Sequence, residues 1–477
     1  MNTKLLKQKI LDLAIRGKLT QQLKTDGTTA DLLKEISSTC HSGAKRSGAI
    51  ESKKSKNPEQ IIPLDKSEAP FEIPPNWEWV CVDAIASLIT DGEHLTPRRI
   101  ESFEGYYLLS ARNIQDNAIH LNDVDYVDEE EYNRISKRCN PRKDDVLISC
   151  SGSIGRVAVV KDDNKYVMVR SAAMIRPVLV HSYYLMYVLQ SNCLQSQIQN
   201  YSKQTAQANL FQAAIRALQI PLPPLAEQQR IVAKIEEAFA EIDAIEKNKE
   251  LLKTHIKQTR QKILDLAIHG KLVPQNKSDE PASVLLERIT RGNPHYEKLT
   301  DIPFEIPESW EWVKLGDVYA YGECENTDVK LIPDTAWILE LEDIEKDSGK
   351  IIHYLTKVER NINGVRHSFK KGDVLYSKLR TYLNKVLVAP NDGFCTTEIM
   401  PIKVGALSSE YICFALRSQY FMDYTALCGY GVKMPRLSTA DAKNGLIPLP
   451  PLAEQKRIVN KIEEIFASLD EISLHLI

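Results

Sequence analysis

The chain has 477 residues, of which 43% are hydrophobic, so it can bury several cores and is too apolar for a disordered protein. A net charge of −3, from 61 Lys and Arg and 64 Asp and Glu, excludes a histone-like polycation but allows a local basic face. The nine Cys form no CxxC pair, and neither a signal peptide nor a run of about 18 apolar residues is present. We therefore expect a cytoplasmic protein with reduced thiols, no metal site and no membrane span.

The first 70 residues divide into a helical region and a linker. Residues 1–36 begin with apolar positions at helical spacing, including Leu6, Ile10 and Leu13. Residues 37–70 contain many Ser, Gly and Lys and few apolar residues, which is typical of a mobile linker. The alternative for the basic cluster in this linker is a contact with phosphate.

Residues 71–219 are the first of two α/β segments. Short β-branched runs such as Val157–Val160 predict strands, and Ser182–Gln199 predicts a helix. Charge is divided within the segment, because residues 71–131 have a net charge of −11 and residues 132–220 one of +8. A basic half inside a neutral protein is expected where DNA phosphates are bound, and the alternative is a pair of ordinary solvated faces.

A long helix is predicted within residues 220–272. No Pro or Gly occurs between Pro224 and Gly270, which predicts a helix over Leu225–Ile268, about 66 Å long at about 1.5 Å per residue. Apolar residues at alternating spacings of four and three give this helix a coiled-coil seam, which calls for a partner helix. The seam residues are Ile231, Ile235, Ile242, Ile245, Leu252, Ile256, Ile263 and Leu266.

The rest of the chain repeats this organisation. Residues 273–303 predict a short helix and a linker, and residues 304–446 predict a second α/β segment. Its charge is divided in the same way, with −9 over residues 304–350 and +6 over residues 351–447. Residues 447–477 predict a C-terminal helix that continues the coiled-coil seam. The seam residues of this helix are Ile458, Ile462, Ile465 and Leu469.

Three blocks of sequence occur twice, which identifies an internal repeat. The matched pairs are Ile220–Ile245 with Ile447–Ile472 at 20 of 26 positions, Gln8–Leu19 with Gln261–Leu272 at 11 of 12, and Phe71–Val80 with Phe304–Val313 at 8 of 10. One copy of the helix is divided between the two termini, so the chain reads as a circularly permuted repeat with pseudo-two-fold symmetry. We expect the two terminal helices to pack antiparallel against the central helix. The alternative is a duplicated gene without functional symmetry.

Catalytic motifs are absent from the sequence. There is no adenine-methylating run of Asn or Asp, Pro, Pro and an aromatic residue, no phosphate-binding P-loop and no glycine-rich turn for S-adenosylmethionine. The short loop Ser151–Gly155 could hold a phosphate through its backbone amides or be an ordinary turn. We therefore predict no catalytic residue, no enzymatic activity and no cofactor in this chain.

The duplicated block IPLPPLAEQ-[QK]-RIV, the block QKILDLAI-[RH]-GKL and the two variable segments resemble the specificity (S, HsdS) subunit of type I restriction–modification systems. The resemblance covers essentially the whole chain. It implies two target recognition domains separated by two long antiparallel helices in a coiled coil, and a non-catalytic subunit that binds a bipartite site on double-stranded DNA. The implied partners are two methyltransferase subunits, which use S-adenosylmethionine for N6-adenine methylation, and two restriction subunits, which use ATP and Mg.

The DNA-facing loops of that family correspond by position to six stretches of this sequence. These stretches are residues 91–97, 110–113, 149–156, 203–209, 376–382 and 429–436. Arg can pair bidentately with guanine, Asn and Gln can pair with adenine, and Lys suits phosphate. The candidate DNA-binding residues are His94, Arg112, Asn113, Ser151, Ser153, Arg156, Gln207, Asn209, Lys378, Arg380, Tyr382, Lys433 and Arg436. The loop beginning at Asp91 has no clean counterpart around Gly322 in the second segment.

Two alternatives stay open from the sequence alone. Any single candidate residue could be a surface charge or could make a hydrogen bond that stabilises the fold. For the whole chain, the alternative is a coiled-coil scaffold whose α/β domains bind protein partners. This scaffold predicts no salt-dependent affinity for DNA.

Overall fold

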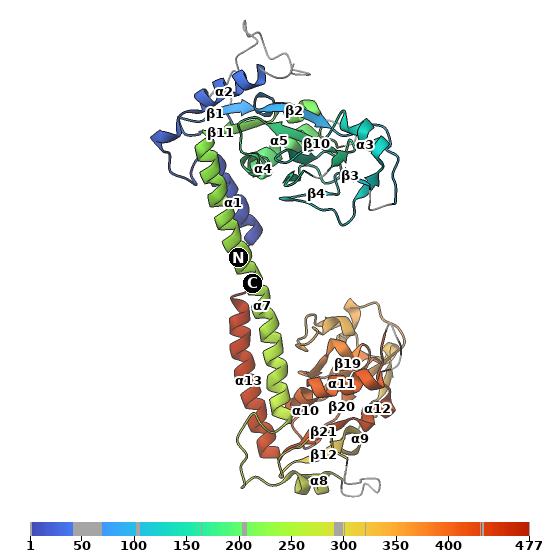
Figure 1. Ribbon diagram of the computed structural model, residues 1–477. Helices are drawn as coiled ribbons and strands as arrows, with labels where there is room; N and C mark the ends of the chain where they lie inside the picture. The colour runs from blue at the N-terminus through green and yellow to red at the C-terminus, as the bar shows by residue number, and fades with distance from the viewer. Residues whose placement is uncertain are drawn as a thin grey trace. The chain divides into compact units, whose positions relative to one another are not determined.

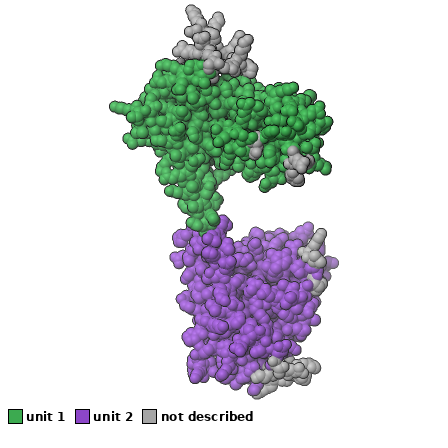
Figure 2. All heavy atoms as spheres, in the orientation of Figure 1, with its two compact units in different colours: residues 1–248 green, residues 249–477 purple. Residues whose placement is uncertain are grey.

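The computed structural model describes residues 2–41, 69–101, 105–163, 165–202, 208–290, 299, 301–319, 321–429, 431 and 434–476. The chain forms two compact units, Met1–Asn248 and Lys249–Ile477 (Figure 2). The boundary between them lies within helix α7, which covers Leu225–Ile268 as predicted. The mixed α/β class is also confirmed, with one α/β domain in each unit (Figure 1).

In the first unit, helix α1 (Thr3–Ile15) packs against the first half of α7 (Figure 1). Lys7 forms an ion pair with Asp243, and further along α1, Leu11 shares a buried core with Ile235. Residue numbers therefore rise along α1 while they fall along α7, so the two helices are antiparallel, as predicted.

Two sheets of three or more strands and two strand pairs, β4 with β5 and β1 with β11, form the α/β domain of the first unit. The main sheet is antiparallel with the order β2-β10-β7-β8, and apolar side chains of α4 pack against it. A smaller sheet has the order β6-β3-β9, and a separate pair, β1 with β11, lies next to the start of α7. The helices besides α1 and α7 are η1 (Lys24–Asp26), α2 (Thr29–His41), η3 (Val82–Ile85), α3 (Glu129–Ser136), α4 (Ser182–Gln190), α5 (Asn192–Ser202) and α6 (Gln212–Ala217). The strands are β1 (Glu78–Cys81), β2 (Ala86–Asp91), β3 (Tyr106–Leu109), β4 (Ile114–Gln115), β5 (Ala118–Ile119), β6 (Asp125–Val127), β7 (Val146–Ser149), β8 (Val157–Val159), β9 (Tyr166–Met168), β10 (Ala172–Pro177) and β11 (Gln219–Leu222).

The second unit has the same plan, with α13 (Leu452–Leu474) in the role of α1. Arg260 of α7 contacts Asp470 at 2.7 Å, whereas Gln275, just beyond α7, contacts Glu454 near the start of α13, so this pair is antiparallel too. The sheets have the orders β18-β17-β20 and β13-β16-β19-β14-β15, and β12 pairs with β21. The helices besides α13 are α8 (Ala282–Thr290), α9 (Leu315–Val318), η4 (Val329–Leu331), η5 (Leu341–Asp343), η6 (Lys357–Glu359), η7 (Thr381–Leu383), α10 (Ser409–Leu416), α11 (Gln419–Cys428) and α12 (Thr439–Asn444). The strands are β12 (Glu311–Lys314), β13 (Asn326–Asp328), β14 (Trp337–Leu339), β15 (Leu355–Thr356), β16 (Val365–Phe369), β17 (Val374–Ser377), β18 (Val386–Val388), β19 (Gly393–Thr396), β20 (Ile399–Ile402) and β21 (Leu446–Leu449).

A buried carboxylate joins the repeated segments inside each unit. In the first unit, Glu227 at the start of α7 accepts hydrogen bonds from Nε1 of Trp77 at 2.8 Å and from Nε2 of Gln22 at 2.6 Å. The equivalent residues of the second unit are Glu454, Trp310 (3.0 Å) and Gln275 (2.6 Å). We call each set of three residues a carboxylate clamp. Because both carboxylates are fully buried, each clamp fixes how its helix meets its α/β domain.

Glycine closes the helix before each clamp. Gly270 has a φ of +66°, and the amide of Lys271 donates to the carbonyl of Leu266 at 2.9 Å, which is a Schellman cap. A Cβ at Gly270 would lie 2.3 Å from Cγ of Pro307. Gly17 has the same conformation at the end of α1. The prediction that Gly270 caps the long helix is therefore confirmed.

The coiled-coil seam is buried only where a partner helix covers it. The buried seam residues are Ile231, Ile235, Ile242, Ile256, Ile458 and Ile462, and the partly buried ones are Ile263, Leu266, Ile465 and Leu469. Ile245 and Leu252 are 49% and 39% exposed, so the prediction of a continuous buried seam is wrong for the middle of α7. The reason is that Thr3, the first residue of α1, lies opposite Glu246, while α13 ends at Leu474.

Two further differences from the sequence-based expectation concern helix ends. Helix α2 continues to His41, five residues into the predicted linker, and residues 42–68 lie outside the described part. The single helix predicted over Ser182–Gln199 is two helices, because Ser191 has an extended backbone between α4 and α5. No helix in the described part of the chain is both long and apolar enough to cross a membrane.

Candidate nucleic-acid interface

In the first unit, hydrogen bonds join described residues that lie in or next to three of the predicted DNA-facing stretches. The amide of Ala111 donates to Oγ of Ser171 at 3.0 Å, and the amide of Cys150 donates to the carbonyl of Ser171 at 2.7 Å. The carbonyl of Cys150 in turn accepts from the amide of Leu210 at 2.9 Å. Three loops that are far apart in sequence therefore share one hydrogen-bonded edge, which we call the first recognition edge.

The loop after β2 joins this edge through Asp91. The carboxylate of Asp91 contacts Nε2 of His94 at 2.8 Å, and it accepts hydrogen bonds from Nη2 of Arg138 and Nε2 of Gln212. Burial alone would raise the pKa of Asp91, but these three hydrogen bonds lower it below its usual value. Asp91 therefore holds His94, Arg138 and Gln212 together as a charged group.

Arg112 and Asn113 are engaged inside their own loop. Nη2 and Nη1 of Arg112 face Asp125 at 2.8 Å and Asp123 at 3.6 Å. Asn113 is 2% exposed, and its amide accepts from Ser110 and donates to the carbonyls of His120 and Asp123. In contrast to the prediction, Asn113 is a residue that stabilises the loop, because all its donors and acceptors are used within the fold.

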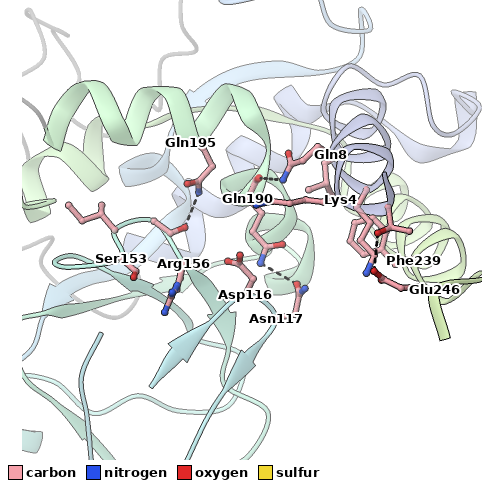
Figure 3. Close-up of a pocket in the computed structure, with 15 residues that line it drawn as sticks. Lys4, Gln8, Asp116, Asn117, Ser153, Arg156, Gln190, Gln195, Phe239 and Glu246 are labelled. Carbon is pink, nitrogen blue, oxygen red and sulfur yellow. Dashed lines mark hydrogen bonds between the residues drawn. The ribbon is translucent and has the colours of Figure 1, made fainter. Parts of the chain in front are cut away.

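Ser151, Ser153 and Arg156 lie on an exposed turn after β7. The buried hydroxyl of Ser149 donates to the carbonyl of Ser153 at 2.6 Å and accepts from the amide of Arg156 at 2.9 Å, which fixes the turn. The turn borders a hollow of about 510 Å³ between the domain, α1 and α7, into which Gln8 and Gln195 also project (Figure 3). The side chains of this turn are thus held on a rigid backbone.

Two candidates lie outside the described residues, namely Gln207 and Lys433. Asn209 is partly exposed and immediately precedes Leu210, so it belongs to the first recognition edge.

The second unit builds an equivalent edge, which we call the second recognition edge. The amide of Leu437 donates to the carbonyl of Lys378 at 2.9 Å, and the amide of Lys378 donates to the carbonyl of Glu398 at 3.0 Å. Leu437, Lys378 and Glu398 occupy the positions that Leu210, Cys150 and Ser171 have in the first unit. The backbone arrangement is therefore repeated, while the side chains at these positions differ.

Cationic side chains gather at the second recognition edge. The amide of Arg380 donates to the carbonyl of Pro435 at 2.7 Å, and Leu379 and Arg436 form a β-bridge. Arg436 is bound by the carboxylate of Glu398 through both Nε and Nη2. Burial, and then the nearby charge of Arg436, lower the pKa of Lys378. Arg380 is exposed, and so is Tyr382, at 59%.

The division of charge along the sequence does not persist in space. Arg134 contacts Glu93 at 2.9 Å, Arg138 contacts Asp91, and Arg216 pairs with Asp83. Each pair joins the basic half of the first segment to its acidic half, so the expectation of a separate basic half is wrong there.

The second unit has no counterpart of β2 in its described residues. The order β18-β17-β20 corresponds to β8-β7-β10, and the position next to β20 that would correspond to β2 is not filled by a strand of the described chain. This agrees with the sequence, in which the loop beginning at Asp91 has no clean match around Gly322.

Comparisons with known proteins identify relatives over the whole chain. A family model described as the type I restriction modification DNA specificity domain matches residues 74–254 and 307–475. The chain is 22% identical over 555 residues to the type I restriction enzyme EcoAI specificity subunit of Escherichia coli, covering 98% of this chain and 90% of that protein. It is 25% identical over 329 residues to the EcoDI specificity subunit of Escherichia coli, covering 69% and 71%. The HsdS subunit from Thermoanaerobacter tengcongensis has a similar fold, with a TM-score of 0.52 at 18% identity, covering 86% of this chain and 94% of that one.

Proposed function

The chain belongs to the family of type I restriction–modification DNA specificity proteins, and we propose that it selects the DNA sequence for a type I restriction–modification complex. The observation that carries this proposal is the repeated recognition edge. The same backbone hydrogen bonds join the loops in both units, whereas the side chains at the equivalent positions differ. A constant backbone with variable side chains is suited to reading two different half-sites of double-stranded DNA.

Three side chains at the recognition edges are free to contact DNA. Arg156 and Arg380 lie on exposed turns without an acidic partner among the described residues, so they can reach phosphates or base edges. Tyr382 presents an exposed ring beside Arg380 that can pack against a sugar or a base. Backbone hydrogen bonds fix the turns that carry Arg156 and Arg380, so the backbone there needs no further ordering when DNA binds.

The helices are the proposed site of the partner subunits. Ile245 and Leu252 expose apolar surface in the middle of α7, and a helix of a partner protein can cover these positions. We propose that two methyltransferase subunits bring S-adenosylmethionine and methylate N6 of an adenine that they rotate out of the duplex. Two restriction subunits would bring ATP and Mg. This chain contributes recognition and assembly and no catalytic group.

The test is genome-wide mapping of N6-methyladenine after co-expression with the cognate methyltransferase subunits. We expect methylation at a split motif with a fixed spacer, and none when this chain is omitted. A contiguous motif, or methylation that is independent of this chain, would contradict the proposal. The scaffold alternative is tested in the same complex, because a protein-binding scaffold would show no DNA affinity that falls with rising salt.

A further inference from the structure

Arg436 is held at the second recognition edge in a defined orientation. Its Nε donates to Oε2 of Glu398 at 3.0 Å, and its Nη2 binds Oε1 of the same carboxylate. The guanidinium is planar and has two forks, one formed by Nε and Nη2 and the other by Nη1 and Nη2. Because Glu398 occupies the first fork, the second fork points away from the carboxylate.

The free fork of Arg436 is suited to a base edge. Within the described residues, Nη1 of Arg436 has no acceptor, and the side chain is 39% exposed. Arginine that binds guanine O6 and N7 uses two parallel N–H groups. Arg112 differs, because both nitrogens of this fork face Asp125 and Asp123. A carboxylate can therefore have two opposite effects on an arginine. It can orient the guanidinium so that the Nη1/Nη2 fork is free for a guanine edge, or it can occupy that fork itself.

Glu398 lies at a position where the backbone is constant and the side chain varies. Its carbonyl accepts from the amide of Lys378, as the carbonyl of Ser171 accepts from the amide of Cys150 in the first unit. The acid is thus not needed to form the loop, because serine serves at the same place. Its presence in the second unit alone points to a role in that unit's selectivity.

The first recognition edge has an acid in a comparable role at a different place. Asp91 contacts Nη2 of Arg138, and within the described residues Nε and Nη1 of Arg138 have no acceptor. The same carboxylate contacts His94 and accepts from Gln212 at the start of α6. Arg138 and Gln212 are therefore presented together by one partly buried acid.

We propose that Glu398 and Asp91 are positioning residues, which orient Arg436 and Arg138 so that each arginine reads a guanine in a different half-site. The proposal rests on the function proposed above. It separates these two arginines from Arg380, whose charge is not neutralised by an acid among the described residues and which therefore contacts phosphate. Discrimination between bases and affinity for any DNA are thus assigned to different side chains of one edge.

The test uses the full chain in complex with its cognate methyltransferase subunits. Methylation motifs are mapped for the wild type and for E398Q, R436K and D91N. The matched control is D392N, which removes an acid that pairs with exposed Lys370 at 2.9 Å in the same domain as Glu398. We expect E398Q and R436K to relax one and the same base position by roughly 5- to 150-fold, D91N to relax a position in the other half-site, and D392N to leave the motif unchanged.

Two further measurements separate positioning from a structural effect. The double variant E398Q/R436K should relax the motif no more than R436K does, because Glu398 acts through Arg436. Binding to DNA without the motif should not fall in E398Q, since an acid is removed from the DNA-facing edge. In R380A this non-specific binding should fall, and the slope of log affinity against log salt should decrease by about one.

The outcomes distinguish the two proposals. A wild-type complex without a bipartite motif refutes the proposed function. A wild-type motif that E398Q leaves intact, or an E398Q variant that loses methylation equally at all positions, overturns the positioning role. If the E398Q variant does not assemble with its partner subunits, the R436K variant tests the proposal instead. An unchanged methylation motif in R436K excludes Arg436 as a residue that recognises a base.

Discussion

The carboxylate clamp of the second unit gives a quantitative prediction for Trp310→Phe. Trp310 is 3% exposed and its Nε1 donates to the buried side chain of Glu454, so the substitution leaves one buried oxygen without this donor. An unsatisfied buried acceptor costs about 1–3 kcal/mol in free energy of unfolding. The loss of indole volume adds a further cost, which a matched variant must remove.

Trp312→Phe is that matched variant. Trp312 is 4% exposed and loses the same volume, but its Nε1 donates to the neutral carbonyl of Phe304 at 3.2 Å, a bond that contributes about 0.5–1.5 kcal/mol. We therefore expect W310F to be less stable than W312F by about 1 kcal/mol, or by about 2–4 °C in the melting temperature of a unit of this size.

The assay is urea unfolding of the full chain, with hydrogen exchange of the β12–β21 amides to report on the second unit. The first unit repeats the experiment, because Trp77 donates to Glu227 and Trp79 to the carbonyl of Phe71, with exchange read at β1–β11. If W310F and W312F lose the same free energy of unfolding, and the phenylalanine variants of Trp77 and Trp79 do so as well, the clamp carboxylates do not determine the stability of the junction.

Three further predictions concern single residues. Burial raises the pKa of Glu454, so the folded state binds this proton more tightly than the unfolded state does. The free energy of unfolding of the wild type, relative to that of E454Q, should therefore increase as the pH falls from 7 towards about 4.5. Unfolding curves measured across this pH range test the prediction. Gly270→Ala should destabilise the second unit by about 1–3 kcal/mol. Gly27→Ala should destabilise the first unit by less, because Gly27 also has a positive φ but has no atom within 4 Å of the position of an added Cβ. Thermal melting of the two variants compares these losses. Asn113→Ala should lower the stability of the first unit by about 1–3 kcal/mol, which thermal melting measures. Methylome mapping should show no single base position at which the methylated motif is relaxed.

The sequence predicts those parts of the fold that depend on local or repeated signals. The bounds of α7 follow from Pro224 and Gly270, since proline starts the helix and a glycine with positive φ ends it. The burial of the seam does not follow from spacing alone. Ile245 and Leu252 have the same heptad positions as buried residues, and only the lengths of the neighbouring helices leave them exposed.

The sequence predicts which loops form the recognition edges better than it predicts which side chains act there. Sequence position locates these loops, although β2 and β7 belong to the main sheet, β3 to the smaller sheet, and Leu210 follows α5. Hydrogen bonds between the loops, and not one shared sheet, hold them at one edge. Arg138 and Glu398 were missed, because each reaches its edge from a segment outside the predicted loops. Asn113 was misassigned, since hydrogen bonds to backbone groups within a short loop leave no trace in composition or spacing.

The carboxylate clamps also bear on how a new DNA specificity can arise. Every clamp residue lies in a block that occurs twice in the chain or within about three residues of one, and each clamp is closed within one unit. Exchange of the domain between Ile220–Ile245 and Ile447–Ile472 needs one crossover with a second gene in each of these blocks, and both blocks then keep their glutamates, Glu227 and Glu454. Such an exchange replaces the side chains at a recognition edge while the carboxylate of each junction stays in place.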